Sequence, residues 1–152
     1  GNPHAVEFPR AMMHDGLDVS FSGLKTSVIN YVKKNPGVDN VDVAASFQAA
    51  VVDVLCAKTI RAAQKVGAKG IVLGGGVSAN SLLRSEMTAR GAAAGFTVAL
   101  PSREMCTDNA AMGGIGWEHI ERNEIADLEL DVLPNVYRKK KQQTKRHGAS
   151  HQ

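Results

Sequence analysis

The sequence predicts an α/β fold, on three observations. Helical patterns and short apolar runs follow one another in the order helix, helix, strand, helix, strand, helix. The apolar runs at residues 70–73 and 96–100 each come after a helical pattern and end at a glycine or a proline, which is typical of strands in a parallel sheet. The composition, with 43% hydrophobic and 22% charged residues, is that of a globular domain.

The first half of the chain is expected to be a loop followed by two helices. Residues 1–19 predict the loop, because two prolines interrupt any regular start. Ser22 is expected to cap a helix over residues 23–34, which Asn35-Pro36-Gly37 ends. A long helix is expected from about Val41 to Val66. Its residues Ala44, Phe47, Val51, Val54 and Leu55 form an apolar stripe of the kind that faces a core.

The second half is expected to contain two strands and two helices. Residues 70–73 predict a buried strand, and a helix follows from about Ala79 to Ala94 with Ser78 as its N-cap. Residues 96–100 predict the second strand, and the last helix is expected from about Asp108 to Arg122. Two strands are too few for a sheet flanked by four helices. The sheet is therefore expected to be incomplete, with its other strands in sequence outside this chain.

The charge is distributed unevenly. The net charge is +3, yet residues 137–152 contain a run of lysines and arginines and no acid, so the rest of the chain has an excess of acidic residues. We therefore divide the chain into a domain over residues 1–136 and a basic, flexible tail over residues 137–152. The tail is either a solvated terminus or a nonspecific contact for RNA phosphates.

Two further features indicate where the protein resides. No apolar run approaches the roughly 20 residues of a membrane span, and the first residues lack a signal pattern. Cys56 and Cys106 form no CxxC motif and imply no disulfide framework. The sequence therefore predicts a cytoplasmic protein without a membrane contact.

The most informative stretch is the glycine turn Gly74-Gly75-Gly76, which lies between a predicted strand and a helix start that carries Asn80. Glycines allow a ligand close to the backbone, and a helix start offers unpaired N–H groups to an anion. The stretch matches neither GxxxxGK[ST] nor GxGxxG. It is either a ligand-binding turn for a nucleotide phosphate, with Asn80 as a hydrogen-bonding amide, or a tight strand-to-helix turn.

Asp108 is the second candidate, in the stretch from Cys106 to Gly114. A carboxylate at the head of a helix is most simply an N-cap. The alternative is a metal ligand in the same crevice as Gly74–Gly76, because both stretches follow the carboxyl end of a strand, where ligands lie in open α/β sheets.

Taken together, several stretches resemble the TsaD family, which was long labelled O-sialoglycoprotein endopeptidases. They occur in family order over residues 8–116, and five such motifs with family-like spacing form a specific match. The matching stretches are Phe8-Pro9-Arg10, Ser20–Thr26, Ala45–Leu55, Gly74–Asn80 with Leu83-Arg84, and Cys106–Met112.

The resemblance implies a fold and an activity. The fold is the actin/Hsp70-like (ASKHA) fold of two RNase H-like halves around a nucleotide cleft, of which this chain would be the C-terminal part. The activity is transfer of a threonylcarbamoyl group from threonylcarbamoyl-AMP to N6 of the adenosine beside the anticodon of tRNAs that read ANN codons. TsaB-like and TsaE-like proteins are the partners that the resemblance implies.

The resemblance also assigns site residues. Asn80, Gly74, Gly75 and Gly76 would bind the adenylate, and Asp108 would be a ligand of one divalent ion, Fe²⁺. The family's paired metal histidines have no counterpart in this sequence, so the chain by itself is expected to be inactive. Three other functions remain open at this point: an ASKHA-type sugar kinase or ATPase, a metalloendopeptidase, and a non-catalytic module that docks partner subunits or tRNA.

Overall fold

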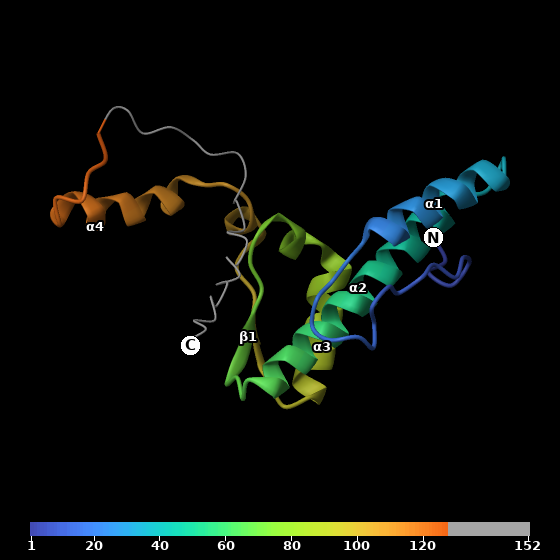
Figure 1. The fold of residues 1–152 in the computed structure, drawn as a ribbon, viewed down its shortest axis with the longest axis horizontal. Helices are drawn as coiled ribbons and strands as arrows, with labels where there is room; N and C mark the ends of the chain where they lie inside the picture. Colours follow the sequence, from blue (N-terminus) through green and yellow to red (C-terminus); the bar gives the residue numbers. More distant parts are fainter. Residues whose placement is uncertain (128–152) are drawn as a thin grey trace, which may run out of the picture. The chain divides into compact units, whose positions relative to one another are not determined.

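The computed structural model describes residues 1–127, in two compact units that divide between Met112 and Gly113 (Figure 1). The first unit is an α/β arrangement, as predicted, and contains a small parallel sheet. In chain order, the elements are α1 Ser22–Lys34, α2 Asn40–Lys65, β1 Gly70–Val72, the 3-10 helix η1 Gly76–Ala79, α3 Ser81–Ala93, β2 Thr97–Ala99, and the 3-10 helices η2 Arg103–Cys106 and η3 Ala110–Gly114. The helix α4 Ile115–Glu121 follows in the second unit. The predicted basic tail, residues 137–152, lies outside the described residues.

The helices α1 and α2 begin and end close to where the sequence predicts. The predicted cap of α1 is wrong, however, because Phe21 is the N-cap residue, makes no side-chain cap, and leaves Ser22 inside the first turn. In α2, by contrast, the Asp39 side chain accepts a hydrogen bond of 2.8 Å from the Val41 N–H. A side-chain cap therefore fixes the start of the longer helix only.

The two strands pair in parallel, with Ile71 opposite Val98. The Leu73 N–H extends the ladder by donating to the Ala99 carbonyl at 3.1 Å. Only Ile71 of β1 is buried, whereas Val72 is 78% exposed. The prediction of a buried strand is therefore right for one face only: within the described residues, helices cover the face that carries Ile71, whereas Val72 on the other face is exposed.

The helix α3 lies close against the sheet at Gly91. A Cβ added at this buried glycine would come within 2.5 Å of Val98 Cγ2. Since real Cβ atoms do not approach so closely, the strand-to-helix spacing depends on the missing side chain.

The core consists of two clusters, and α2 contributes residues to both. Figure 1 shows α2 running beside α1 over one part of its length and beside α3 over another. The first cluster joins α2, β1 and α3 through Val52, Cys56, Ala63, Ile71, Leu83 and Met87. The second joins α2, α1 and the N-terminal segment through Val6, Phe8, Leu24, Val43 and Ala50.

The apolar stripe predicted on α2 is largely wrong as a core face. Ala44 and Phe47 are exposed, Val51 and Leu55 are half-buried, and only Val54 is fully buried. The core takes a neighbouring set of small residues instead, because α2 carries alanine and valine around most of its circumference. The other four residues of the predicted stripe line an open groove.

By length and composition alone, α2 could cross a membrane, although no membrane span was predicted from the sequence. A core helix passes the same test when it is rich in small apolar residues. Because α2 contributes residues to both core clusters, we interpret it as a core helix.

An ion-pair network joins three parts of the first unit. Asp53 of α2 accepts from Arg10 of the N-terminal segment at 2.9 Å and from Arg90 of α3 at 2.8 Å. Burial by itself raises the pKa of the Asp53 carboxyl, but the hydrogen bonds and charges of Arg90 and Arg10 outweigh it, so the pKa is lowered. Two of the family-like motifs, around Arg10 and Asp53, thus meet in a structural contact.

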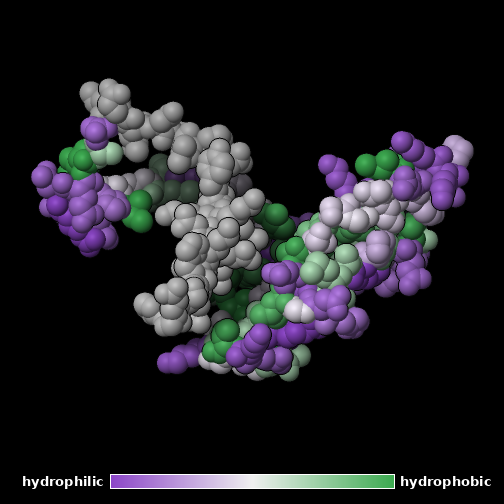
Figure 2. Space-filling model, viewed as in Figure 1, coloured by the Kyte–Doolittle hydropathy of each residue, from purple (hydrophilic) through white to green (hydrophobic). Residues whose placement is uncertain are grey.

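The second unit contains the short helix α4. The predicted last helix begins later than expected: residues 110–114 form a 3-10 helix, and α4 covers only Ile115–Glu121. Ile115, Ile120 and Trp117 are exposed on it, and Figure 2 shows green hydrophobic side chains there beside purple polar ones. The Trp117 ring N–H donates to Glu121 at 2.7 Å.

Candidate functional site

An open groove of about 740 Å³ lies beside the carboxyl end of β1. Residues of α2, including all of the predicted stripe except Val54, form one wall, and the turn after β1 together with the start of α3 forms the other. Most of its lining is apolar, with the amides of Gln48 and Asn80 among the polar groups. Its lining includes Phe21, Phe47, Gln48, Leu73, Gly74 and Asn80.

The glycine turn has the shape that the sequence predicts. Gly75 has φ +80°, which L side chains rarely adopt, and its carbonyl accepts from the Ser78 N–H at 2.9 Å and the Ser78 hydroxyl at 2.6 Å. A Cβ added at Gly74 or Gly76 would meet no atom within 4 Å. Within the described residues, the N–H groups of Gly74 and Gly75 donate to no partner. Open space and free donors therefore lie together at this turn.

Asn80 proves to be the N-cap of α3, which corrects the prediction that Ser78 caps this helix. Its Oδ1 accepts from the Leu83 N–H at 3.0 Å, and its Nδ2 donates to Gln48 Oε1 at 3.1 Å. One Nδ2 hydrogen and one Oδ1 lone pair are left for another partner. Asn80 also lines the groove, so the structure brings it together with Gly74.

Asp108 caps none of the described helices, so its interpretation as an N-cap is wrong. The neighbouring Asn109 caps the 3-10 helix η3 instead, since its Oδ1 accepts from the Ala111 N–H at 3.1 Å. Asp108 is exposed, and no described residue donates a hydrogen bond to its carboxylate. An exposed and unshared carboxylate is available to a cation.

The described residues include no group of three or more His, Cys, Asp or Glu side chains that could hold a metal ion. Asp108 can therefore supply one ligand, but the part of the chain that the structure describes does not form a complete metal site around it. Cys106 lies nearby but is 1% exposed, and its thiol donates to the Ser102 carbonyl at 3.3 Å. It behaves as a buried core residue.

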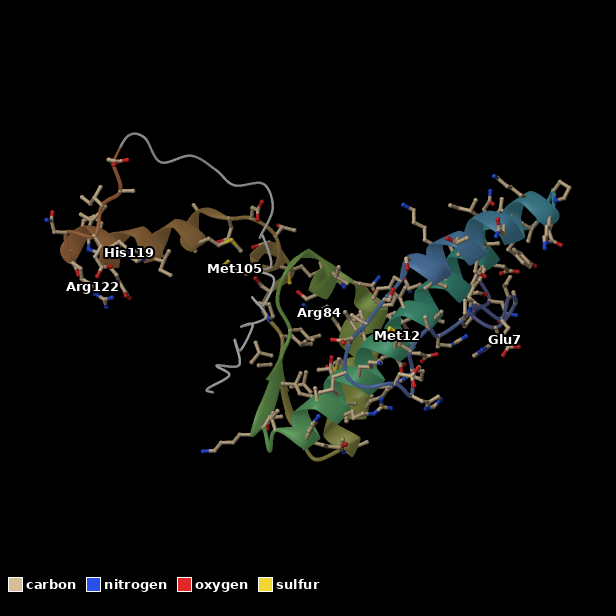
Figure 3. All side chains as sticks on the ribbon, in the orientation of Figure 1. Glu7, Met12, Arg84, Met105, His119 and Arg122 are labelled. Atoms are coloured by element: carbon tan, nitrogen blue, oxygen red, sulfur yellow. The ribbon has the colours of Figure 1, made fainter. Side chains whose placement is uncertain are left out.

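The hydrogen bonds of Arg84 to two separate segments were not predicted from the sequence. This residue of α3 donates to the Ser78 carbonyl at 3.1 Å and to the Pro101 carbonyl at 2.7 Å. Figure 3 labels Arg84 on α3 and Met105 on the segment after β2. The sequence gives only a weak signal for this contact, an arginine one turn after a predicted strand-to-helix turn.

The comparisons with known proteins match this part of the molecule. The family model described as "TsaD: tRNA N6-adenosine threonylcarbamoyltransferase" matches residues 1–115. A protein of that name from Moorella thermoacetica is 49% identical over 142 residues, 90% of this chain and 42% of its own length. Proteins of the same name from Clostridioides difficile and Geobacter metallireducens are 46% and 45% identical, over 90% and 89% of this chain.

The chain spans about two fifths of the length of these relatives, 42% for two of them and 41% for the third. The motif resemblance is confirmed over the first 115 residues, which include the glycine turn, Asn80 and Asp108. What the relatives do as whole proteins is a property of chains more than twice as long.

Proposed function

The chain belongs to the TsaD family, and we propose that it is the C-terminal part of a tRNA N6-adenosine threonylcarbamoyltransferase. In the complete protein, the reaction moves a threonylcarbamoyl group from threonylcarbamoyl-AMP to N6 of the adenosine beside the anticodon in tRNAs that read ANN codons. The observation that carries the proposal is the glycine turn at the edge of the groove.

In this proposal the groove binds the adenylate. The free N–H groups of Gly74 and Gly75 face the phosphate, and the open space at Gly74 and Gly76 lets the backbone approach it. The apolar wall of the groove accommodates the nucleoside, and the unused hydrogen and lone pair of the Asn80 amide bind it. Gln48 holds the Asn80 amide in orientation.

In this reaction the main task of the protein is to position the two substrates. N6 of the adenosine attacks the carbamoyl carbon, the bond from that carbon to the phosphate oxygen breaks, AMP leaves, and N6 loses a proton. The nucleophile belongs to the tRNA, so the chain needs none of its own.

Asp108 completes the proposal as one ligand of a divalent ion, Fe²⁺, whose other ligands come from outside this chain. When bound, such an ion polarises a carbonyl oxygen or orients the substrate. The support from this chain is the exposed carboxylate without a described partner.

The wider setting follows from the family as well. We propose the ASKHA arrangement of two RNase H-like halves for the complete protein, with tRNA, threonylcarbamoyl-AMP and TsaB-like and TsaE-like proteins as partners in the cytoplasm. The parallel pairing of β1 with β2 is the arrangement expected for part of such an α/β sheet. The relatives' names favour the transferase over a sugar kinase or ATPase of the same fold and over the older peptidase label.

A hybrid protein tests the function. The matching 142 residues of this chain replace the corresponding part of the Moorella thermoacetica relative, and the hybrid is produced in bacteria depleted of their own transferase. We expect the modified adenosine to reappear in tRNA hydrolysates analysed by mass spectrometry. A folded hybrid that restores none of it, while the unaltered relative does, would contradict the proposal.

A further inference from the structure

We propose that Arg84 is a positioning residue that holds two strand-end segments in one arrangement. The first segment is the glycine turn with η1, residues 74–80. The second is the segment 101–108, which contains η2 and leads to Asp108. This inference rests on the proposed function, because it matters most if both segments serve one reaction.

The contacts of Arg84 reach both segments. One guanidinium nitrogen, Nη1, donates to the Ser78 carbonyl at 3.1 Å and approaches Cys106 Sγ at 3.7 Å. The other, Nη2, donates to the Pro101 carbonyl at 2.7 Å. The segments follow different strands, and η1 packs against η2. A single side chain thus joins the ends of β1 and β2.

The chemistry of arginine suits this part. Its guanidinium is planar and carries donors in a fixed fork, so two carbonyls can be bound at a set separation. A lysine has a single charged nitrogen on a flexible stem and satisfies such a pair less well. Arg84 does not line the groove, so it acts through the main chain of both segments and not on the ligand.

The consequence concerns Asp108. This residue lies two positions after Cys106, whose sulfur is against Arg84 and whose thiol is bonded within the same segment. Arg84 keeps a fixed separation between the turn that faces the adenylate phosphate and the carboxylate that faces the metal. Without it, each segment keeps its own hydrogen bonds but their separation varies.

Amide hydrogen exchange on this chain tests the contact itself. We compare Arg84→Gln and Arg84→Lys with a control, Arg103→Gln. The control also removes one positive charge, but from η2, where within the described residues Arg103 bonds only to the Ser81 hydroxyl, at 2.9 Å. Arg84→Gln should speed exchange in both segments by roughly tenfold or more, the effect of losing charge-assisted hydrogen bonds. The α2 core should be unchanged, and Arg84→Lys should give an intermediate effect. Unaltered segments, or equal acceleration everywhere, would overturn the contact.

Kinetics of the hybrid transferase test whether the contact positions reacting groups. Arg84→Gln should lower kcat by about tenfold or more and leave KM for threonylcarbamoyl-AMP within about threefold, because the glycine turn still binds while its alignment is lost. Arg84→Lys should recover part of kcat. Normal kcat despite loosened segments would overturn the positioning role. An inactive unsubstituted hybrid would instead refute the proposed function, and the exchange result would then decide the inference alone.

Discussion

At the residue scale, Asn80 caps α3 and also donates to Gln48, and neither role could be assigned from the sequence. Ser78 and Asn80 are both good capping residues two positions apart, so local preference does not decide between them. The structure decides because residues 76–79 form a 3-10 helix, which moves the start of α3 to Ser81. Ser78 then bonds back to Gly75 and leaves the cap to Asn80.

Substitution of Asn80 tests whether it is the N-cap of α3. Asn80→Ala should lower the free energy of unfolding of this chain by about 1 kcal/mol, the usual cost of losing an N-cap. Asn80→Asp should keep most of that stability, because aspartate caps as well, while it removes the donor to Gln48. Urea unfolding followed by circular dichroism measures both. An Asn80→Ala variant as stable as the unsubstituted chain, or an Asn80→Asp variant destabilised as much as Asn80→Ala, would contradict the cap.

Substitution of Asp108, unlike that of Asn80, should change metal binding and leave stability nearly unchanged. Because its carboxylate is exposed and has no described partner, Asp108→Asn should change the free energy of unfolding by no more than a few tenths of a kcal/mol. In the hybrid transferase the same substitution should sharply lower the bound iron, because a neutral amide attracts a cation poorly. Metal analysis after gel filtration checks this. Full iron content in a folded variant would leave Asp108 without a ligand role.

At the element scale, the sequence predicted most elements well and their faces less well. Periodicity and glycine or proline boundaries place α1, α2, α3 and both strands within a few residues of the observed bounds. The buried face of α2 was missed because alanine and valine lie all around it. The last helix was placed too early because its first part is rich in small residues and glycine, which here form a 3-10 helix instead.

The loop before α1 is anchored by α2 in a way that no motif indicates. Lys58 is 3% exposed, and its ammonium group donates to the carbonyls of Asp15 at 2.6 Å, Asp18 at 2.7 Å and Gly16 at 3.3 Å. Lys58→Met keeps the stem but leaves these carbonyls without their donor, so it should destabilise the chain by about 1–3 kcal/mol. Lys65→Met, on the exposed end of the same helix, is the control. Equal urea midpoints for the two variants would refute the anchor.

The ion pairs of Asp53 with Arg10 and Arg90 predict that the free energy of unfolding depends on pH. The pKa of Asp53 is lower in the folded chain than in the unfolded one, so this carboxylate contributes stability above its unfolded value near 4. That contribution is lost as the pH falls through the lower folded pKa. The unsubstituted chain should therefore lose stability more steeply below about pH 4 than Asp53→Asn does, in urea titrations at several pH values. Parallel curves would contradict the network.

At the scale of the whole molecule, the open groove agrees with the proposal that this chain is part of a longer protein. The groove, the bare face of β1 and the exposed part of α2 all lie in the first unit. The sequence predicted an incomplete sheet from its strand count, and the described residues form a sheet of two strands, β1 and β2. The groove could not be predicted, because it depends on which face of α2 the core leaves uncovered.

In the proposed function, the glycine turn binds the adenylate. Gly74 has an ordinary φ, and a Cβ there would enter open space, so the described fold itself does not require a glycine at this position. Gly74→Ala should therefore leave the free energy of unfolding within about 0.5 kcal/mol of the unsubstituted hybrid. Gly23→Ala, which also meets open space but lies in α1, is the matched control.

Calorimetric titration of the hybrid with AMP is the most direct measurement. We expect Gly74→Ala to weaken AMP binding by about tenfold or more, because the added methyl group enters the space through which the phosphate reaches the free N–H groups. Gly23→Ala should bind AMP like the unsubstituted hybrid. If Gly74→Ala folds normally and binds AMP with unchanged affinity, the glycine turn is a structural connection only, and the adenylate binds elsewhere.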